Sequence, residues 1–319
     1  MPVEFSSEAL QMVTAGAIVS AVALPLGFLS WAIGRARSTP MLPSWKPWRV
    51  PWGGFEVFAA YIVVAFTIPF ALAQSHLLPT AVGVIALPIQ LAFLAFTLRT
   101  LYPNWKPRIL AMPVLPLAVL VWAVLTPLVL LFHSGVVQLF TAMGWKPDEH
   151  PLAKLGGGPL FENALFLLQA CVAAPLIEEI LFRGVLLAWV IGGHERSQES
   201  PPQTPTAIRP WLVMGVAVLF AALSGKVGPV VFAGGLAAGL VIVWVTVRRG
   251  KRHLRAVYAS AAMFAMVHSA VWPSPVPLFL LGLGLGWCAV RTRGVLVPAI
   301  VHGLFNAVSA VYVLRGGTS

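Results

Sequence analysis

Charged residues are scarce in this chain. Asp, Glu, Lys and Arg make up 10% of its 319 residues, whereas a soluble domain carries about 25%. Strand-like alternation of polar and apolar residues is also absent, which argues against an outer-membrane barrel. Apolar sequence is plentiful instead: the hydrophobic share is 59%, and runs of membrane length recur from end to end. The sequence therefore predicts an all-α, polytopic transmembrane helix bundle of about 8–10 helices in a lipid bilayer.

Cysteines are equally few. The two present, Cys171 and Cys288, both lie in apolar segments, which is typical of packing residues rather than of a disulfide pair. Neither CxxC nor the zinc motif HExxH occurs. Basic residues are missing from the start of the chain, which instead carries Glu4 and Glu8. Because a signal peptide starts with a basic region, we expect the first apolar segment to be a retained transmembrane helix.

The net charge of +11 arises from Lys and Arg in short loops between the apolar segments. Topology explains such loops, because cytoplasmic loops are rich in these residues, and we expect no nucleic-acid partner. Every second loop is basic, which predicts a multi-pass protein of the plasma (inner) membrane with cytoplasmic basic loops and both termini outside. The region 133–163 is predicted to be an external loop. The expected membrane segments are approximately 10–34, 55–73, 81–98, 109–132, 164–192, 211–224, 229–247, 256–272, 277–290 and 295–314.

Two adjacent glutamates inside an apolar segment point to chemistry. Glu178 and Glu179 occur in CVAAPLIEEILFRGVLLAWV, and the whole chain has only ten acidic residues. Ionisable side chains at bilayer depth are costly and usually functional. Arg183 lies one helical turn after Glu179, so the two are predicted to form an ion pair. Glu178 is rotated by about 100° from Glu179 and lacks that partner, and Pro175 is predicted to bend the helix locally.

Two further apolar segments each carry one histidine. His268 lies one turn after Phe264, and His302 lies one turn before Asn306, so each pair shares a helix face. Lipid cannot satisfy polar side chains, so helices in a bundle bury their polar faces against one another. We therefore expect the two histidine faces to converge with the glutamate pair. Structural alternatives stay open, because a membrane histidine is often a helix-to-helix hydrogen-bond donor and a Glu–Arg pair can be a clamp.

The three motifs resemble those of the CPBP family, the CAAX-protease and bacteriocin-processing group that is also called Abi. They are EExxxR at Glu178, Glu179 and Arg183, FxxxH at Phe264 and His268, and HxxxN at His302 and Asn306. The resemblance covers about 164–192 and 256–314. It implies a catalytic transmembrane domain at 151–319 with an insertion near 193–255, preceded by transmembrane helices of unknown role at 1–150.

The resemblance implies an intramembrane endopeptidase that hydrolyses a peptide bond in a membrane-associated or prenylated protein or peptide. Glu178 would be the general base that activates water, and His268 would bind and orient that water. His302 and Asn306 would form the oxyanion hole. The supporting residues would be Glu179, Arg183 and Phe264. Peptide hydrolysis needs these parts, namely a base, a water molecule and donors aimed at the developing oxyanion.

Two alternatives differ in mechanism or in class. A zinc protease would use Glu178, His268 and His302 as its ligands. Arg183 disfavours a dication and Asn306 is a poor ligand, so no cofactor is favoured. The chain could instead be a non-catalytic scaffold, an immunity protein or a transporter. The sequence shows no inverted repeat and no second acidic site at membrane depth, which favours the peptidase.

Overall fold

The computed structural model describes residues 49–103, 114–148, 159–194, 206–247 and 253–314, with a few isolated positions between 21 and 32. Within them the protein is all-α, apart from a parallel bridge between β1 (Arg49–Val50) and β2 (Gly193–His194). Among the described residues, six helical stretches are long and apolar enough to cross a membrane: Gly54–Ala73, Ala81–Leu101, Leu115–Ala142, Leu160–Ile191, Val227–Thr246 and Pro275–Thr292. The predicted all-α, polytopic class is confirmed. The predicted segment 10–34 lies outside the described residues, except for those isolated positions.

The chain divides into two compact units that interleave along the sequence. Unit 1 comprises Met1–Ser44, Pro113–His150 and Pro210–Thr292, and unit 2 comprises Trp45–Met112, Pro151–Arg209 and Arg293–Ser319. The predicted division near residue 150 separates a region of unknown role from a catalytic domain. The predicted division concerns the roles of the two regions, whereas the two units are defined by their compactness, so the predicted division stays a prediction.

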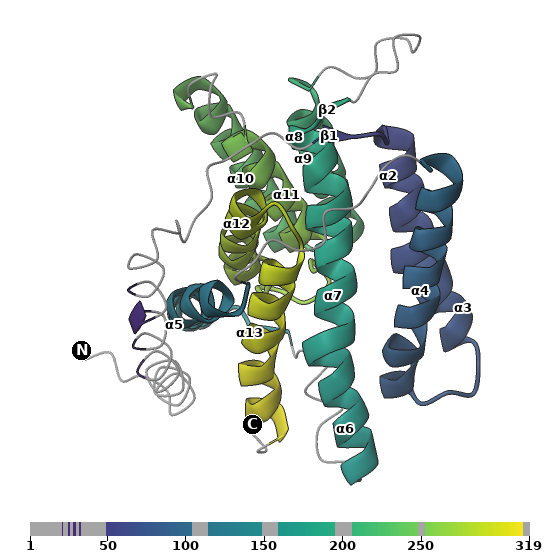
Figure 1. Ribbon diagram of the computed structural model, residues 1–319. Helices are drawn as coiled ribbons and strands as arrows, with labels where there is room; N and C mark the ends of the chain where they lie inside the picture. Colours follow the sequence, from purple (N-terminus) through teal and green to yellow (C-terminus); the bar gives the residue numbers. More distant parts are fainter. Residues whose placement is uncertain are drawn as a thin grey trace. The chain divides into compact units, whose positions relative to one another are not determined.

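Unit 2 is built around one long interrupted helix, which Figure 1 shows as a nearly continuous ribbon from α6 to α8. Its parts are α6 (Leu160–Leu168), η3 (Gln169–Ala173), α7 (Ala174–Glu179), η4 (Ile180–Leu187) and α8 (Ala188–Ile191). A second interrupted helix consists of α2 (Gly54–Ala60), η1 (Tyr61–Thr67) and α3 (Ile68–Ala73), with α4 (Pro79–Leu101) beside it. α13 (Leu296–Leu314) packs against η3 and α7, and this contact builds the site described below.

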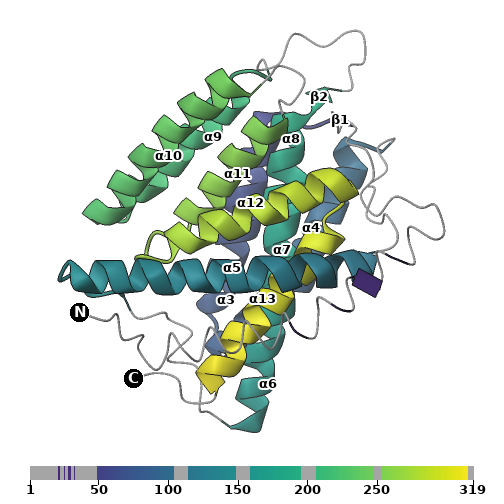
Figure 2. The ribbon, with the colours of Figure 1, turned by 90° about the vertical axis from the view of Figure 1, so that its left-hand side faces the viewer.

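Unit 1 contains α5 (Val114–Ala142), α9 (Arg209–Leu223), α10 (Val227–Thr246), α11 (His253–Met266) and α12 (Pro275–Thr292). α11 packs against both α10 and α12, and α12 packs against α5 (Figure 2). α9 and α10 are separate helices, because the chain turns between them at Gly225, where φ is +68°.

Two predicted boundaries in unit 1 were wrong. α5 is a single unbroken helix that continues to Ala142 (Figure 2), so residues 133–142 are not part of an external loop. Ser134 and Val136 are buried in this part of the helix, so packing keeps the segment helical although it contains more polar residues than the segment before it. The segment expected at 256–272 forms a helix only as far as Met266. Its last turn tightens, since the backbone N–H groups of His268 and Ser269 each donate to the carbonyl three residues back.

Three π segments interrupt the described helices of unit 2. A π segment shifts the backbone hydrogen bonds by one residue. In each segment a side chain from elsewhere in the chain donates to a backbone carbonyl: Gln90 Nε2 to Val64 at 2.7 Å, Asn306 Nδ2 to Ala170 at 2.8 Å, and Trp52 Nε1 to Val185 at 3.2 Å. Tertiary hydrogen bonds therefore fix the helix distortions on both sides of the glutamate pair.

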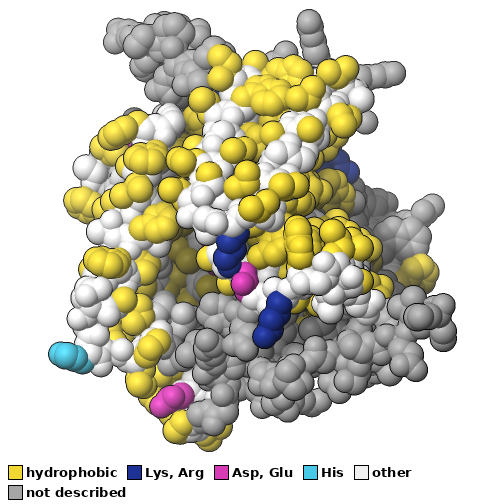
Figure 3. Space-filling model, turned by 180° about the vertical axis from the view of Figure 1, so that it is seen from behind, with side chains coloured by type: hydrophobic (Ala, Val, Ile, Leu, Met, Phe, Trp, Pro, Cys, Tyr) yellow, Lys and Arg dark blue, Asp and Glu magenta, His cyan; other side chains and the backbone are white. Residues whose placement is uncertain are grey.

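The exposed surface of the described residues is largely apolar. Figure 3 shows one face on which the described side chains are mainly hydrophobic, with few charged ones. Large apolar side chains are exposed on several of the long helices, including Phe55 at 80%, Phe96 at 69% and Val245 at 77%. Water does not favour such a surface, whereas lipid does. Together with the six membrane-length helices, this surface makes the protein an integral, multi-pass membrane protein.

A polar cluster joins three loops at one end of unit 1. Asp148 Oδ2 accepts hydrogen bonds from Lys226 Nζ at 2.6 Å and from the backbone N–H of Trp272 at 2.7 Å. The Asp148 N–H in turn donates to the Trp272 carbonyl, and Lys226 Nζ also donates to the carbonyl of Ala270. The cluster therefore fixes the loop that follows His268.

The cluster predicts an acid-sensitive contribution to stability. Burial by itself raises the pKa of Asp148, but the hydrogen bonds from Lys226 and Trp272 and the Lys226 charge outweigh it, so the pKa lies below its usual 3.8. A lowered folded-state pKa stabilises the folded state above the unfolded pKa, and this contribution is lost as pH falls through the folded pKa. Both side chains are more than a third exposed, at 39% for Lys226 and 37% for Asp148. Solvent screening therefore limits the expected effect to about 1 kcal/mol.

Asp148→Asn is expected to lower the Tm of the detergent-solubilised protein at about pH 7, and the two curves should converge below about pH 3. Thermal unfolding recorded across this range measures the difference. Lys226→Gln, which removes the other partner, should give a similar loss at neutral pH. A gap between Asp148→Asn and wild type that stays constant from neutral to acid pH would contradict the assignment.

Candidate functional site

The glutamate pair lies at the C-terminal end of α7, between two π segments. Glu179 and Arg183 are both fully buried, and Arg183 Nη1 donates to Glu179 Oε1 at 2.8 Å. The ion pair predicted from their spacing of one helical turn is confirmed. Each of the two charges offsets part of the other's desolvation, so neither stands alone in the helix interior.

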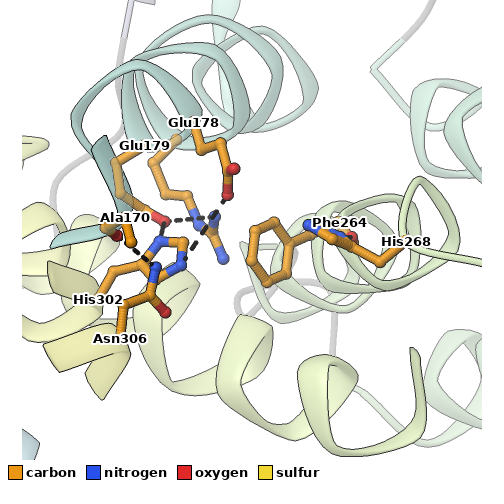
Figure 4. Close-up of polar contacts among 8 residues, drawn as sticks. Ala170, Glu178, Glu179, Phe264, His268, His302 and Asn306 are labelled. Carbon is orange, nitrogen blue, oxygen red and sulfur yellow. Dashed lines mark hydrogen bonds and ion pairs between the residues drawn. The ribbon is translucent and has the colours of Figure 1, made fainter. Parts of the chain in front are cut away.

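His302 from α13 bridges toward both glutamates, as Figure 4 shows. Its Nδ1 lies 3.0 Å from Glu179 Oε1, and its Nε2 lies 3.9 Å from Glu178 Oε2. A carboxylate oxygen only accepts, so Nδ1 carries the proton in the first contact and Nε2 faces the second carboxylate. The side chain of Glu178 is 28% exposed, and it makes no hydrogen bond to another described residue. The two neighbouring carboxylates therefore have different environments: Glu179 is buried and bound through Oε1 by Arg183 and His302, whereas Glu178 is partly open.

Asn306 completes the contact between α13 and the long helix of unit 2. Its Nδ2 donates to the Ala170 carbonyl at 2.8 Å. In a π segment each backbone N–H donates to the carbonyl five residues earlier, and in η3 the N–H of Ala174 donates to the carbonyl of Gln169. The Ala170 carbonyl would need the N–H of residue 175, which is a proline and has none. Asn306 thus satisfies the carbonyl that Pro175 leaves open, and this hydrogen bond uses one of its two amide N–H groups. The bend expected at Pro175 takes the form of this π segment.

Gly303 allows α13 to approach the long helix closely. A Cβ atom at this position would lie 2.3 Å from the Cys171 carbonyl oxygen, a backbone atom that cannot turn aside. Sequence reasoning missed this residue and the Ala170 carbonyl. Signals for both were present, since a glycine follows His302 directly and Pro175 lies five residues after Ala170.

Gly303→Ala is expected to push α13 away from η3 and to lower stability by about 2 kcal/mol, a typical cost of overpacking. Because His302 and Asn306 are carried on the same helix, proteolytic activity should fall as well. Gly215→Ala is the matched control, because a Cβ there meets nothing within 4 Å. It should leave the Tm unchanged or raise it, since alanine favours helix over glycine. Equal Tm values for the two variants would contradict the close approach at Gly303.

His268 and Phe264 lie in unit 1. His268 Nδ1 lies 2.8 Å from the Phe264 carbonyl, and the two rings meet edge to face with centroids 5.2 Å apart. A carbonyl only accepts, so Nδ1 donates and Nε2 is left as the acceptor nitrogen. The two were predicted to share a helix face, and their rings do meet, although His268 lies just beyond the end of α11 rather than within a helix. The convergence of His268 with the glutamates stays a prediction, whereas the faces of Glu178 and His302 do meet in unit 2.

Unit 2 alone does not supply the ligands of a zinc site, and the zinc set predicted from the sequence also includes His268 of unit 1, so the absence of a cofactor stays a prediction. No group of three or more His, Cys, Asp or Glu side chains is placed to hold a metal in the part of the chain that the structure describes. In unit 2 the Nδ1 of His302 already donates to Glu179 Oε1, and Arg183 forms an ion pair with the same carboxylate. A structural Zn²⁺ has four protein ligands and a catalytic one has three. No step below therefore passes through a metal.

The part of the chain that carries these motifs is similar to a known protein family. Residues 160–254 and 248–308 match the family described as type II CAAX prenyl endopeptidase Rce1-like. The matched residues include the EExxxR, FxxxH and HxxxN motifs. Over this stretch the chain is similar to the CAAX prenyl endopeptidases. No curated protein and no solved structure shows significant similarity to the chain.

The CAAX protease family is a family of peptidases, so the class of enzyme predicted from the three motifs is supported at the level of the family. The unit 2 cluster of glutamates, arginine, histidine and asparagine comes from two of those motifs and lies entirely within the matched residues. This cluster is the candidate active site.

Proposed function

We propose that this protein is a CAAX-type intramembrane endopeptidase that hydrolyses a peptide bond near the C-terminus of a prenylated or membrane-associated protein. The observation that carries the proposal is the unequal environment of two adjacent carboxylates. Glu179 is buried and bound by Arg183 and His302, whereas Glu178 is partly open and makes no hydrogen bond to another described residue. A general base needs such an open oxygen within reach of water.

In the proposed reaction Glu178 removes a proton from a water molecule, and the water oxygen attacks the scissile carbonyl. Glu178 then returns the proton to the leaving amine. His302, held through Nδ1 by Glu179, presents Nε2 beside Glu178, where a protonated ring donates to the developing oxyanion. The second amide N–H of Asn306 is the further donor, since the Ala170 carbonyl takes the first.

His268 is proposed to bind and orient the attacking water. Its Nδ1 is engaged by the Phe264 carbonyl, so Nε2 can accept a hydrogen bond from that water. The reaction as proposed uses no metal, and it takes place in the plasma (inner) membrane. Similarity to a peptidase family favours proteolysis over the alternatives of a scaffold, an immunity protein or a transporter.

The test is cleavage of a defined peptide by the purified protein in liposomes. One peptide carries a farnesylated CAAX C-terminus, and its control is identical but lacks the prenyl group. Mass spectrometry should find the farnesylated peptide shortened at its C-terminus and the control largely intact. Cleavage should persist in a strong chelator. Loss of cleavage in chelator with recovery on added zinc would reject the metal-free mechanism, and no cleavage of either peptide would reject the proposed substrate class.

The natural substrate can be sought by expressing the wild-type protein and Glu178→Gln in cell membranes and comparing the protein termini in each. New protein C-termini that are found with the wild-type protein and disappear in Glu178→Gln would be its products. Identical terminus profiles, with both proteins folded and equally abundant, would turn the argument toward the non-proteolytic alternatives.

A further inference from the structure

Tyr61 is a buried polar residue near the glutamates that none of the three motifs includes. It is the first residue of η1, on the interrupted helix formed by α2, η1 and α3, and it is only 8% exposed. Its ring meets the edge of Phe182 at a centroid distance of 5.4 Å and an interplanar angle of 83°. Phe182 lies one helical turn after Glu178, so Tyr61 packs on the side of the long helix that carries the open glutamate.

The hydroxyl of Tyr61 is buried and has no hydrogen-bond partner among the described residues. It lies within electrostatic range of Arg183, Glu179 and Glu178. Most buried hydroxyls in proteins are hydrogen-bonded, and an unsatisfied one costs about 1–3 kcal/mol, so such a group needs an explanation. Ring packing alone does not supply one, since phenylalanine would pack equally well.

A second unsatisfied oxygen lies in the same cluster. Glu179 Oε2 is buried without a partner among the described residues, while its other oxygen binds Arg183 and His302. A carboxylate oxygen accepts hydrogen bonds and a phenol both donates and accepts. A water molecule between the phenol and the carboxylates would satisfy both groups, and buried waters typically occupy such polar positions.

We propose that the Tyr61 hydroxyl is a positioning group of the active site, which donates a hydrogen bond to water held at the glutamate pair. The inference rests on the proposed function, because the water it positions is the one from which Glu178 removes a proton. The π segment that begins at Tyr61 supports it, since π distortions are frequent at functional sites. In this segment the Gln90 side chain holds the Val64 carbonyl, which fixes the backbone next to Tyr61.

The test is Tyr61→Phe, which keeps the ring and removes only the hydroxyl. Its kcat on the farnesylated peptide is expected to fall about tenfold, the effect of losing one hydrogen bond in the transition state. KM should change by less than about twofold, because the water rather than the substrate is affected. The Tm should stay the same or rise, because the variant removes an unsatisfied buried group.

Tyr102→Phe is the matched control in the same unit. The Tyr102 hydroxyl donates to Glu56 Oε1 at 2.9 Å, so its loss should lower the Tm and leave kcat unchanged. Wild-type kcat in Tyr61→Phe, or a loss of kcat that accompanies a loss of Tm, would overturn the proposal.

A wild-type protein that cleaves neither peptide would reject the proposed function and would leave the placement of water to be tested directly. A high-resolution structure then decides. An ordered water within hydrogen-bond distance of Tyr61 Oη and a glutamate oxygen supports the positioning role, and a dry hydroxyl overturns it.

Discussion

Glu178→Gln is expected to reduce kcat for peptide cleavage by about 10²–10⁴-fold, the usual contribution of a positioned general base. Glutamine keeps the size and shape of the side chain but cannot take a proton from water. KM should change little, because the base acts on water rather than on bound peptide. The Tm should also change little, since Glu178 is partly exposed and its contact with His302 is long, at 3.9 Å. Initial rates in liposomes and thermal unfolding in detergent measure the two effects separately.

Glu162→Gln is the matched control for this prediction. Glu162 lies in the first turn of α6, on the same long helix, and is only partly buried. Its neutralisation should leave kcat within about twofold of wild type, because it lies outside the proposed site. If Glu178→Gln and Glu162→Gln were equally active, the base would have to be another group. If both lost activity in parallel with Tm, the effect would be one of folding.

Part of this site could be predicted from sequence because its geometry is local. The spacing of Glu179 and Arg183 by one helical turn was enough to predict their ion pair, and the rotation of about 100° per residue separated Glu178 from it. The nine predicted segments that fall within the described residues all correspond to helices, because long apolar runs are dictated by the bilayer. The predicted boundaries were less accurate, since α5 ends at Ala142, ten residues beyond its expected end at 132.

The remaining features depend on partners far apart in the chain. His302 reaches Glu179 across 123 residues, and Asn306 reaches Ala170 across 136. The motifs predicted that polar faces meet, but not that His302 would hydrogen-bond Glu179 and leave Glu178 open. The π segments depend on equally distant residues, because Gln90, Asn306 and Trp52 donate to carbonyls within them. No local pattern identifies such a donor.

Arg183→Met is expected to destabilise the folded protein by about 3–5 kcal/mol, as is typical when one partner of a buried ion pair is removed. Methionine fills much of the space of the arginine side chain but leaves Glu179 buried with an uncompensated charge. Glu179 is fully buried and one of its oxygens already has no partner, so the loss of the Arg183 contact cannot be compensated by exposure to water. Thermal unfolding of the solubilised protein should show a large fall in Tm.

The double variant Glu179→Gln/Arg183→Met separates two effects of losing Arg183, the unpaired charge left on Glu179 and the loss of side-chain packing. Glutamine is neutral, and its carbonyl oxygen can still accept the hydrogen bond from His302 Nδ1 that Glu179 Oε1 accepts in the wild type. The double variant should therefore regain most of the Tm that Arg183→Met loses, because replacing both partners of a buried ion pair is often nearly neutral. A double variant as unstable as Arg183→Met would mean that Arg183 acts through its packing rather than through its charge. Recovered stability without recovered cleavage is the expected result, because a neutral glutamine stabilises the protonated ring of His302 beside Glu178 less than the Glu179 carboxylate does.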